Sequence, residues 1–127
     1  MSTDYSKMSD FEINKLVFKN KTALSALSYP HSADKRSCGH KDINNIYHWF
    51  DFCNNPADAW PIIVANKISI VSLDNKWIAA PVDTVIDGIT GDSEVCFYAS
   101  SDSVVDVNPL RAAMIVFLMM QDSKNAS

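Results

Sequence analysis

The chain has 127 residues, enough for one compact domain, and 47% of them are hydrophobic. Its longest wholly apolar run, residues 112–120, is too short to span a membrane, and its first residues contain no signal-peptide core. These features argue against a membrane protein, and we expect a soluble protein that stays in the compartment in which it is made.

The formal net charge of −4 is unevenly distributed along the chain. Residues 1–44 carry seven Lys and Arg against five Asp and Glu, whereas residues 45–127 carry four against ten. The negative charge of the second part would repel a nucleic-acid backbone, so general DNA or RNA binding is disfavoured.

The amino-terminal part predicts one helix, a loop and a strand. Ser9 and Glu12 have the spacing of a capping box, and a helix follows from residue 10 to about residue 19. Residues 28–44 are rich in turn-forming and charged side chains and predict an exposed loop. The aromatic residues within 46–52 favour a strand.

The stretch that begins at Asn55 carries the strongest local signals. Asn55 followed by Pro56 is typical of a capped helix start, and Asp58 in the first turn complements the helix dipole. Pro61 lacks the N–H that would continue the helix, so we expect the helix to stop or kink there. Trp60 would then lie at a rigid corner, where it either fills the core or forms one wall of a pocket.

The following residues predict a short helix and several strands. The helix is expected at residues 62–66, and the strands at residues 68–73, 77–80 and 95–99, with a loop over residues 83–92 and a polar connection over residues 100–107. Asn108 and Pro109 indicate the start of a last helix over residues 110–121. That helix is apolar on nearly all sides, so it is either the central helix of the domain or packs on a second copy.

We therefore expect an α+β fold. A small antiparallel sheet of about three to four strands would pack with an amino-terminal and a carboxy-terminal helix. One domain accounts for residues 1–127, and we expect the protein to self-associate.

Three blocks of sequence, residues 9–15, 54–63 and 108–114, carry a family resemblance. In their order and separation they resemble the NinX-like proteins of lambdoid phages. Ile68 and Trp77 also stand where those proteins place a strand and its aromatic residue. The resemblance implies a phage accessory protein that acts inside a bacterial cell, and it supplies no known activity.

One departure from the family pattern concerns the middle block. Many relatives have a Gly-Gly pair before Pro-Ile-Ile, whereas Ala59 and Trp60 precede Pro61 here. Pocket geometry therefore does not transfer from those relatives to this chain.

A zinc site is one candidate chemistry, but its possible ligands are poorly spaced. Structural zinc sites usually hold ligands in close pairs such as Cys-x-x-Cys, which the chain lacks. An odd number of cysteines without paired spacing favours free thiols in a reducing cytoplasm. Ordinary buried or solvent-exposed side chains are the better interpretation of Cys38, His40, His48 and Cys53, and of His31 and Cys96, which would be spare ligands.

A nucleophilic cysteine is a second candidate. Cys53 precedes a capped helix start, and His48 is near it in sequence. No motif around either residue orients it for catalysis, so a buried Cys53 packed below Trp60 is the better interpretation. We expect no catalytic residues, no metal and no cofactor.

The helix starts at Asn55 and Asn108 form a candidate anion site, because each presents unpaired backbone N–H groups. Arg111 lies in the first turn of the last helix, where a cation opposes the helix dipole and needs a negative partner. That partner is either an internal carboxylate, such as Asp58 or Asp106, or a bound phosphate. With a phosphate, a tryptophan would stack on the base. The candidate ligand-binding residues are Asn54, Asn55, Asp58, Trp60, Trp77, Asn108 and Arg111.

Two functions fit these features. A phosphate with a stacked base describes a nucleotide-derived ligand, so the protein would bind and sequester a host immune signal such as a cyclic nucleotide or an ADP-ribose derivative. Alternatively, the acidic second part and the basic pair Lys35 and Arg36 would dock a host protein, as an adaptor or inhibitor does. In both cases the protein acts in the cytoplasm of the infected host.

Overall fold

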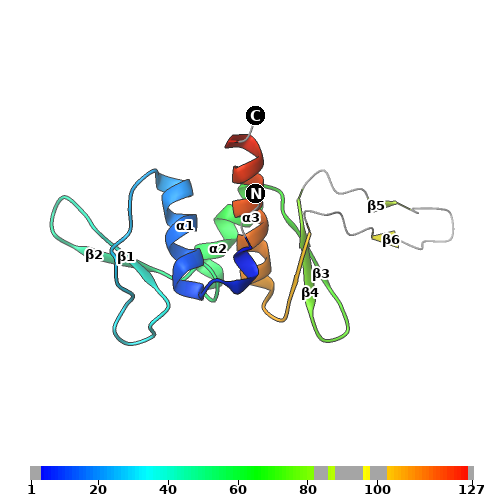
Figure 1. Ribbon diagram of the computed structural model, residues 1–127, viewed down its shortest axis with the longest axis horizontal. Helices are drawn as coiled ribbons and strands as arrows, with labels where there is room; N and C mark the ends of the chain where they lie inside the picture. The colour runs from blue at the N-terminus through cyan, green and yellow to red at the C-terminus, as the bar shows by residue number, and fades with distance from the viewer. Residues whose placement is uncertain (1–3, 82–85, 88–95, 98–102, 126–127) are drawn as a thin grey trace.

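The computed structural model describes residues 4–81, 86–87, 96–97 and 103–125. These residues form an α+β fold, which confirms the predicted fold class (Figure 1). The helices are α1 (Asp10–Thr22), α2 (Pro56–Ala65) and α3 (Pro109–Asn125), and a 3-10 turn, η1 (Tyr5–Lys7), precedes them. The strands are β1 (Cys38–Lys41), β2 (Tyr47–Phe50), β3 (Ser69–Ser72), β4 (Trp77–Ala80), β5 (Ile86–Asp87), β6 (Cys96–Phe97) and β7 (Val104–Asp106).

Helix α3 is the centre of the molecule. Its residues 112–118 are all buried, and α1, α2, β4 and β7 pack against it. Figure 1 shows α1 and α2 on one side of α3 and the three-stranded sheet on the other. The apolar surface of this helix is thus used within the chain, as expected of the central helix of a domain.

The strands divide into separate sheets instead of one. A three-stranded antiparallel sheet has the order β3-β4-β7, and the neighbouring residues Ile70, Ala79 and Val104 pack into the core. Strand β7 lies in the segment predicted as a polar connection. Its two valines stand among serines and aspartates, so the composition hides a strand of only three residues.

Strands β5 and β6 pair with each other in antiparallel register, Ile86 with Phe97 and Asp87 with Cys96. The rest of the predicted loop over residues 83–92 and of the predicted strand over residues 95–99 lies outside the described residues. Among the helices that the structure describes, none is long and apolar enough to cross a membrane.

Strands β1 and β2 form a hairpin at the opposite end of the molecule from the three-stranded sheet (Figure 1). The Asp42 side chain forms its turn, because it accepts hydrogen bonds from the N–H groups of Asn44 at 2.8 Å and Ile46 at 3.0 Å. Asn45 completes the turn in the left-handed conformation, with φ of 65°.

This hairpin corrects the prediction of an exposed loop over residues 28–44. Strand β1 lies inside that range, and Ser37, Cys38 and Gly39 are buried. The small side chains of this segment let its backbone approach α1, where the Cys38 thiol contacts the carbonyl of Asn14 at 3.4 Å. Polar composition therefore hid the strand at residues 38–41, whereas residues 28–37 lie outside regular secondary structure, as predicted.

Helix α1 begins where the sequence predicts. The Ser9 hydroxyl accepts a hydrogen bond from the Glu12 N–H at 3.1 Å, and the Glu12 carboxylate accepts one from the Ser9 N–H at 3.4 Å. The helix continues to Thr22, where Ala23 takes the left-handed conformation that ends it.

The prediction for Pro61 was a stop or a kink, and the stop is wrong, because helix α2 continues past this residue. It runs without a break to Ala65, with Ala59, Ile62 and Ile63 buried. Pro61 and the carbonyl of Ala57, four residues earlier, are on the exposed side of the helix, where water can satisfy the freed carbonyl. Packing of the apolar face therefore outweighs the local cost of the proline.

Candidate functional site

The two asparagine-capped helix starts lie side by side. The Asn55 side chain accepts a hydrogen bond from the Ala57 N–H at 3.0 Å, and the Asn108 side chain accepts one from the Leu110 N–H at 2.9 Å. The amide of Asn108 also donates to the Asn54 side chain at 3.1 Å. Both predicted caps are confirmed, and Asn54 joins the starts of α2 and α3.

Arg111 is engaged by groups of the chain itself. Its guanidinium contacts Asp10 at 2.7 Å and Asp106 at 3.3 Å, and it donates to the carbonyls of Ser6 at 3.1 Å and Met8 at 2.8 Å. The Arg111 side chain is only 13% exposed. Internal carboxylates therefore offset the unfavourable position of this cation at a helix start. Asp106 is one of the two internal partners that the sequence analysis considered for Arg111, and the other, Asp58, does not contact Arg111.

A second polar cluster surrounds the buried carboxylate of Asp51. One of its oxygens accepts from the amides of Asn14 at 3.0 Å and Asn54 at 3.1 Å, and the other accepts from Arg36 Nε at 3.1 Å. Asn14 is fully buried, and its side chain also bonds to the backbone of Arg36 and Cys53. Because each buried polar group has partners, the cluster ties α1, β2 and the start of α2 together.

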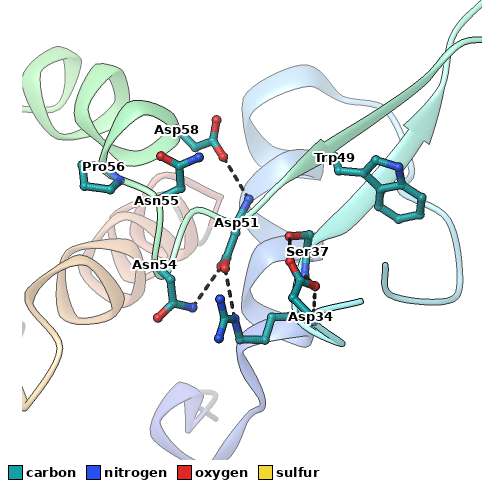
Figure 2. A pocket seen from close by; sticks show the side chains of 9 residues that line it. Asp34, Ser37, Trp49, Asp51, Asn54, Asn55, Pro56 and Asp58 are labelled. Carbon is teal, nitrogen blue, oxygen red and sulfur yellow. Dashed lines mark hydrogen bonds and ion pairs between the residues drawn. The ribbon is translucent and has the colours of Figure 1, made fainter. Parts of the chain in front are cut away.

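Beside this cluster the surface forms a hollow of about 320 Å³ (Figure 2). Polar side chains dominate its lining, which consists of Asp34, Arg36, Ser37, Trp49, Asp51, Asn54, Asn55, Pro56 and Asp58. Three of these residues are acidic and one is basic, so the lining is negative. The carboxylate of Asp58 accepts a hydrogen bond from the Asp51 N–H at 3.0 Å, which fixes it at the rim.

The Asp34 carboxylate contributes permanent negative charge to this acidic hollow. Burial favours a higher pKa for Asp34, but hydrogen bonds from the Ser37 hydroxyl and from the N–H groups of Arg36 and Ser37 lower this pKa to about 2. Asp34 is therefore ionised throughout the neutral pH range.

Trp49 connects the acidic hollow to a group of exposed and partly exposed rings on the hairpin and in the segment before it. The Tyr47 ring lies parallel to it with 6.2 Å between centroids, and the His31 ring meets it edge-on at 4.7 Å. The Tyr29 ring is 6.5 Å from that of Trp49 between centroids, and its hydroxyl interacts with that of Tyr47. We call Tyr29, His31, Tyr47 and Trp49 the aromatic surface.

The two tryptophans chosen from the sequence lie elsewhere. Trp60 is 62% exposed on α2 and does not line the acidic hollow, so it neither fills the core nor walls this pocket. Trp77 is in β4, at the opposite end of the molecule from the hairpin. Of the candidate residues, Asn54, Asn55 and Asp58 line the hollow, and Asn108 and Arg111 are joined to it through Asn54 and Asp10.

Sequence reasoning missed Asn14, Asp51 and Trp49 as residues of a site, and it gave Arg36 another role, in a basic pair with Lys35 that docks a host protein. Asn14 carried a usable signal, because it lies among Ile13 and Val17 on the apolar face of a predicted helix. A polar residue in such a position needs a buried partner. Asp51, enclosed by two phenylalanines in the chain, gave a similar signal.

The cysteine and histidine candidates do not assemble into one site. Cys38 and Cys53 are free and buried, and burial raises the pKa of the Cys53 thiol and raises that of Cys38 to about 12. His48 pairs with Asp42 at 2.7 Å on the hairpin. Within the described part of the chain, no three His, Cys, Asp or Glu side chains are placed to hold a metal ion.

The described structure defines a small α+β domain whose helix starts are joined by partly buried polar side chains, with an acidic hollow and an aromatic surface on one side. The chain belongs to the family described as Bacteriophage P22, NinX, whose model matches residues 4–121. This match confirms the resemblance seen in the three sequence blocks and makes the chain a phage protein. The search of curated proteins found no match.

Proposed function

We propose that this NinX-family protein acts by binding, without catalysis, in the cytoplasm of the infected host, and that its ligand is a host protein. The observation that carries this proposal is the exposed aromatic surface next to the acidic hollow. Aromatic side chains are enriched at protein interfaces, where they supply large contact areas at low entropic cost.

The exposure of the hairpin supports a protein partner. On the hairpin, Tyr47 is 46% exposed, and Ile43 and Ile46 at its turn are 95% and 55% exposed. Tyr29, in the segment before β1, is 50% exposed. Apolar side chains gathered on one element of a small domain are typical of an interaction surface. An adaptor or inhibitor of a host factor would use such a surface.

The same structure gives less support to a nucleotide-derived immune signal. That hypothesis used Arg111 as the phosphate ligand, and its guanidinium is occupied by Asp10 and Asp106. Arg36 is the cation in the acidic hollow, and it is paired with Asp51. Three carboxylates around the hollow would repel a phosphate.

The experiment compares proteins captured from host lysate by the wild-type chain and by a Tyr47→Ser variant. We expect one host protein to be enriched by the wild type and lost with the variant, because Tyr47 is exposed and can be changed without opening the core. Material released by heating the purified protein is analysed by mass spectrometry in parallel. A nucleotide-like mass, with calorimetric binding of a cyclic nucleotide or a cyclic ADP-ribose, would favour sequestration of a signal instead.

Self-association stays a prediction. It rested on the apolar surface of α3, which is used inside the chain, so a second copy would have to pack on another surface such as the hairpin. Analytical ultracentrifugation of the wild type and the Tyr47→Ser variant measures this directly.

A further inference from the structure

The rings of the aromatic surface are held in place by the hairpin. Tyr47 and Trp49 are two residues apart on β2, so their side chains share one face of the strand. Their rings are parallel to within 9°. Tyr29 and His31 are also two residues apart, and they bring further rings against Trp49 from the segment before β1.

Gly39 lies directly beneath the ring of Trp49. These two residues are opposite each other in the β1–β2 register, and a Cβ atom added at Gly39 would lie 2.4 Å from Cζ3 of Trp49. The ring therefore lies directly over the backbone of β1, with no room for a side chain beneath it. A ring fixed in this way binds a ligand with little loss of side-chain entropy.

The acidic hollow begins at the Trp49 end of the aromatic surface. Trp49 lines the hollow together with Asp34, Asp51 and Asp58 (Figure 2). An extended ligand that lies on the aromatic surface therefore continues into a negatively charged site. The two features together require a ligand with flat apolar groups followed by a positive group.

We propose that the aromatic surface and the acidic hollow bind an extended, proline-containing segment of the partner protein that carries an arginine or lysine. This inference rests on the proposed function and specifies its partner. Proline segments adopt the polyproline II helix, which is preformed and docks on aromatic-lined grooves. Proline has no backbone N–H, so such a segment gives up few hydrogen bonds to water when it packs on aromatic rings. One turn of this helix, about 9 Å long, covers neighbouring rings.

The charge of the hollow selects the residue next to the prolines. An arginine guanidinium is planar, stacks on an aromatic face such as that of Trp49, and forms paired hydrogen bonds with carboxylates. Asp58 is the carboxylate best placed to receive it, because only one of its oxygens has a hydrogen-bond partner among the described residues. Arg36 is half exposed and can move aside without leaving the surface of the domain.

The test uses a library of synthetic peptides with two prolines three residues apart and an arginine on either side. Binding to the full-length chain is measured by calorimetry at low ionic strength. We expect at least one arginine-containing peptide to bind, and we expect its binding to weaken when the prolines are replaced by alanine or the arginine by glutamine.

Variants of the protein locate the site. Tyr47→Ser should weaken binding by about tenfold or more, as loss of a central aromatic contact does. Asp58→Asn keeps a hydrogen-bond acceptor but removes the charge. It should weaken binding of the arginine peptide and leave binding of the glutamine peptide unchanged. Trp77→Ser removes a partly exposed ring at the other end of the molecule and should leave binding unchanged. Circular dichroism checks that each variant is folded.

Two results would overturn the inference. One is an absence of binding across the library, and the other is binding that Tyr47→Ser does not weaken. If the library fails while capture of a host protein still depends on Tyr47, the peptide class is wrong and the proposed function stands. If capture also fails, the proposed function is wrong as well.

Discussion

At the scale of single residues, Arg111 joins parts of the chain that are far apart in sequence. Its guanidinium bonds to carbonyls near η1 and to Asp10 at the start of α1, and it pairs with Asp106 at the end of β7. The side chains of the two carboxylates are about a quarter exposed or less, at 24% and 21%. The loss of their shared cation would therefore leave both carboxylates poorly solvated and without a counter-ion.

We expect Arg111→Ala to lower the free energy of unfolding by about 2–3 kcal/mol, a value reduced from that of fully buried pairs because the carboxylates are partly hydrated. Urea unfolding at pH 7 measures the change. Arg111→Lys, which keeps the charge but not the several directed hydrogen bonds, should be intermediate. A change below about 0.5 kcal/mol for the alanine variant would show that the contacts are not stabilising.

The sequence predicted those polar residues whose partners are local. Ser9, Asn55 and Asn108 cap helices through N–H groups two or three residues away, so the pattern is visible in a short window. The Asn14 and Asp51 contact spans 37 residues. Such a pair depends on the three-dimensional path of the chain, and only the buried position of Asn14 hints at it.

At the scale of secondary structure, α2 shows tertiary packing outweighing a local preference. The buried residues Ala59, Ile62 and Ile63 hold both halves of the helix against the core, although Pro61 lies between them. A helix that stopped at Pro61 would leave Ile62 and Ile63 without this packing, at a cost of about 1.5–3 kcal/mol for each side chain. This cost is comparable with that of an interior proline, about 3 kcal/mol.

We expect Pro61→Ala to raise the free energy of unfolding by about 1–2 kcal/mol. Alanine restores the missing N–H, and part of this gain is offset because proline also restricts the unfolded chain. Thermal unfolding measures the change. Pro56→Ala is the matched control, since a proline at the first helical position gives up no hydrogen bond and its removal should change stability by less than about 0.5 kcal/mol. A destabilised Pro61→Ala variant would contradict this account of α2.

Element prediction succeeded where the hydrophobic pattern was long and failed where it was short. The helices α1 and α3 have caps and extended apolar faces, so their existence and starts were predicted. Strand β1 reads Cys-Gly-His-Lys, which has no β-strand pattern, and it forms because Gly39 accommodates Trp49 of β2. The residues that favour strand β1 are therefore those of its partner β2 and not its own.

At the scale of the whole molecule, the hairpin and the three-stranded sheet lie at opposite ends, with α3 between them (Figure 1). The hairpin packs on α1, where Phe18 stacks on Phe50 at 5.5 Å between ring centroids. The Asp51 cluster adds a polar connection from β2 to α1. One cooperative domain therefore depends on these connections.

The three tryptophans report on separate parts of the chain: Trp49 on the hairpin, Trp60 on α2 and Trp77 on the three-stranded sheet. In variants that keep one tryptophan and carry phenylalanine at the other two positions, we expect urea unfolding followed by fluorescence to give coincident midpoints. A lower midpoint for Trp49 alone would make the hairpin a separate unit, and the single-domain prediction would be wrong.

The burial of Cys38 and Cys53 provides an internal measure of breathing motions. Both thiols are buried against backbone carbonyls of α1, and their raised pKa values keep them protonated and unreactive in the closed form. An alkylating reagent reaches them only when the packing around α1 separates for a moment, so the alkylation rate counts those openings. The two buried thiols thus report how often the core of this domain becomes accessible to solvent.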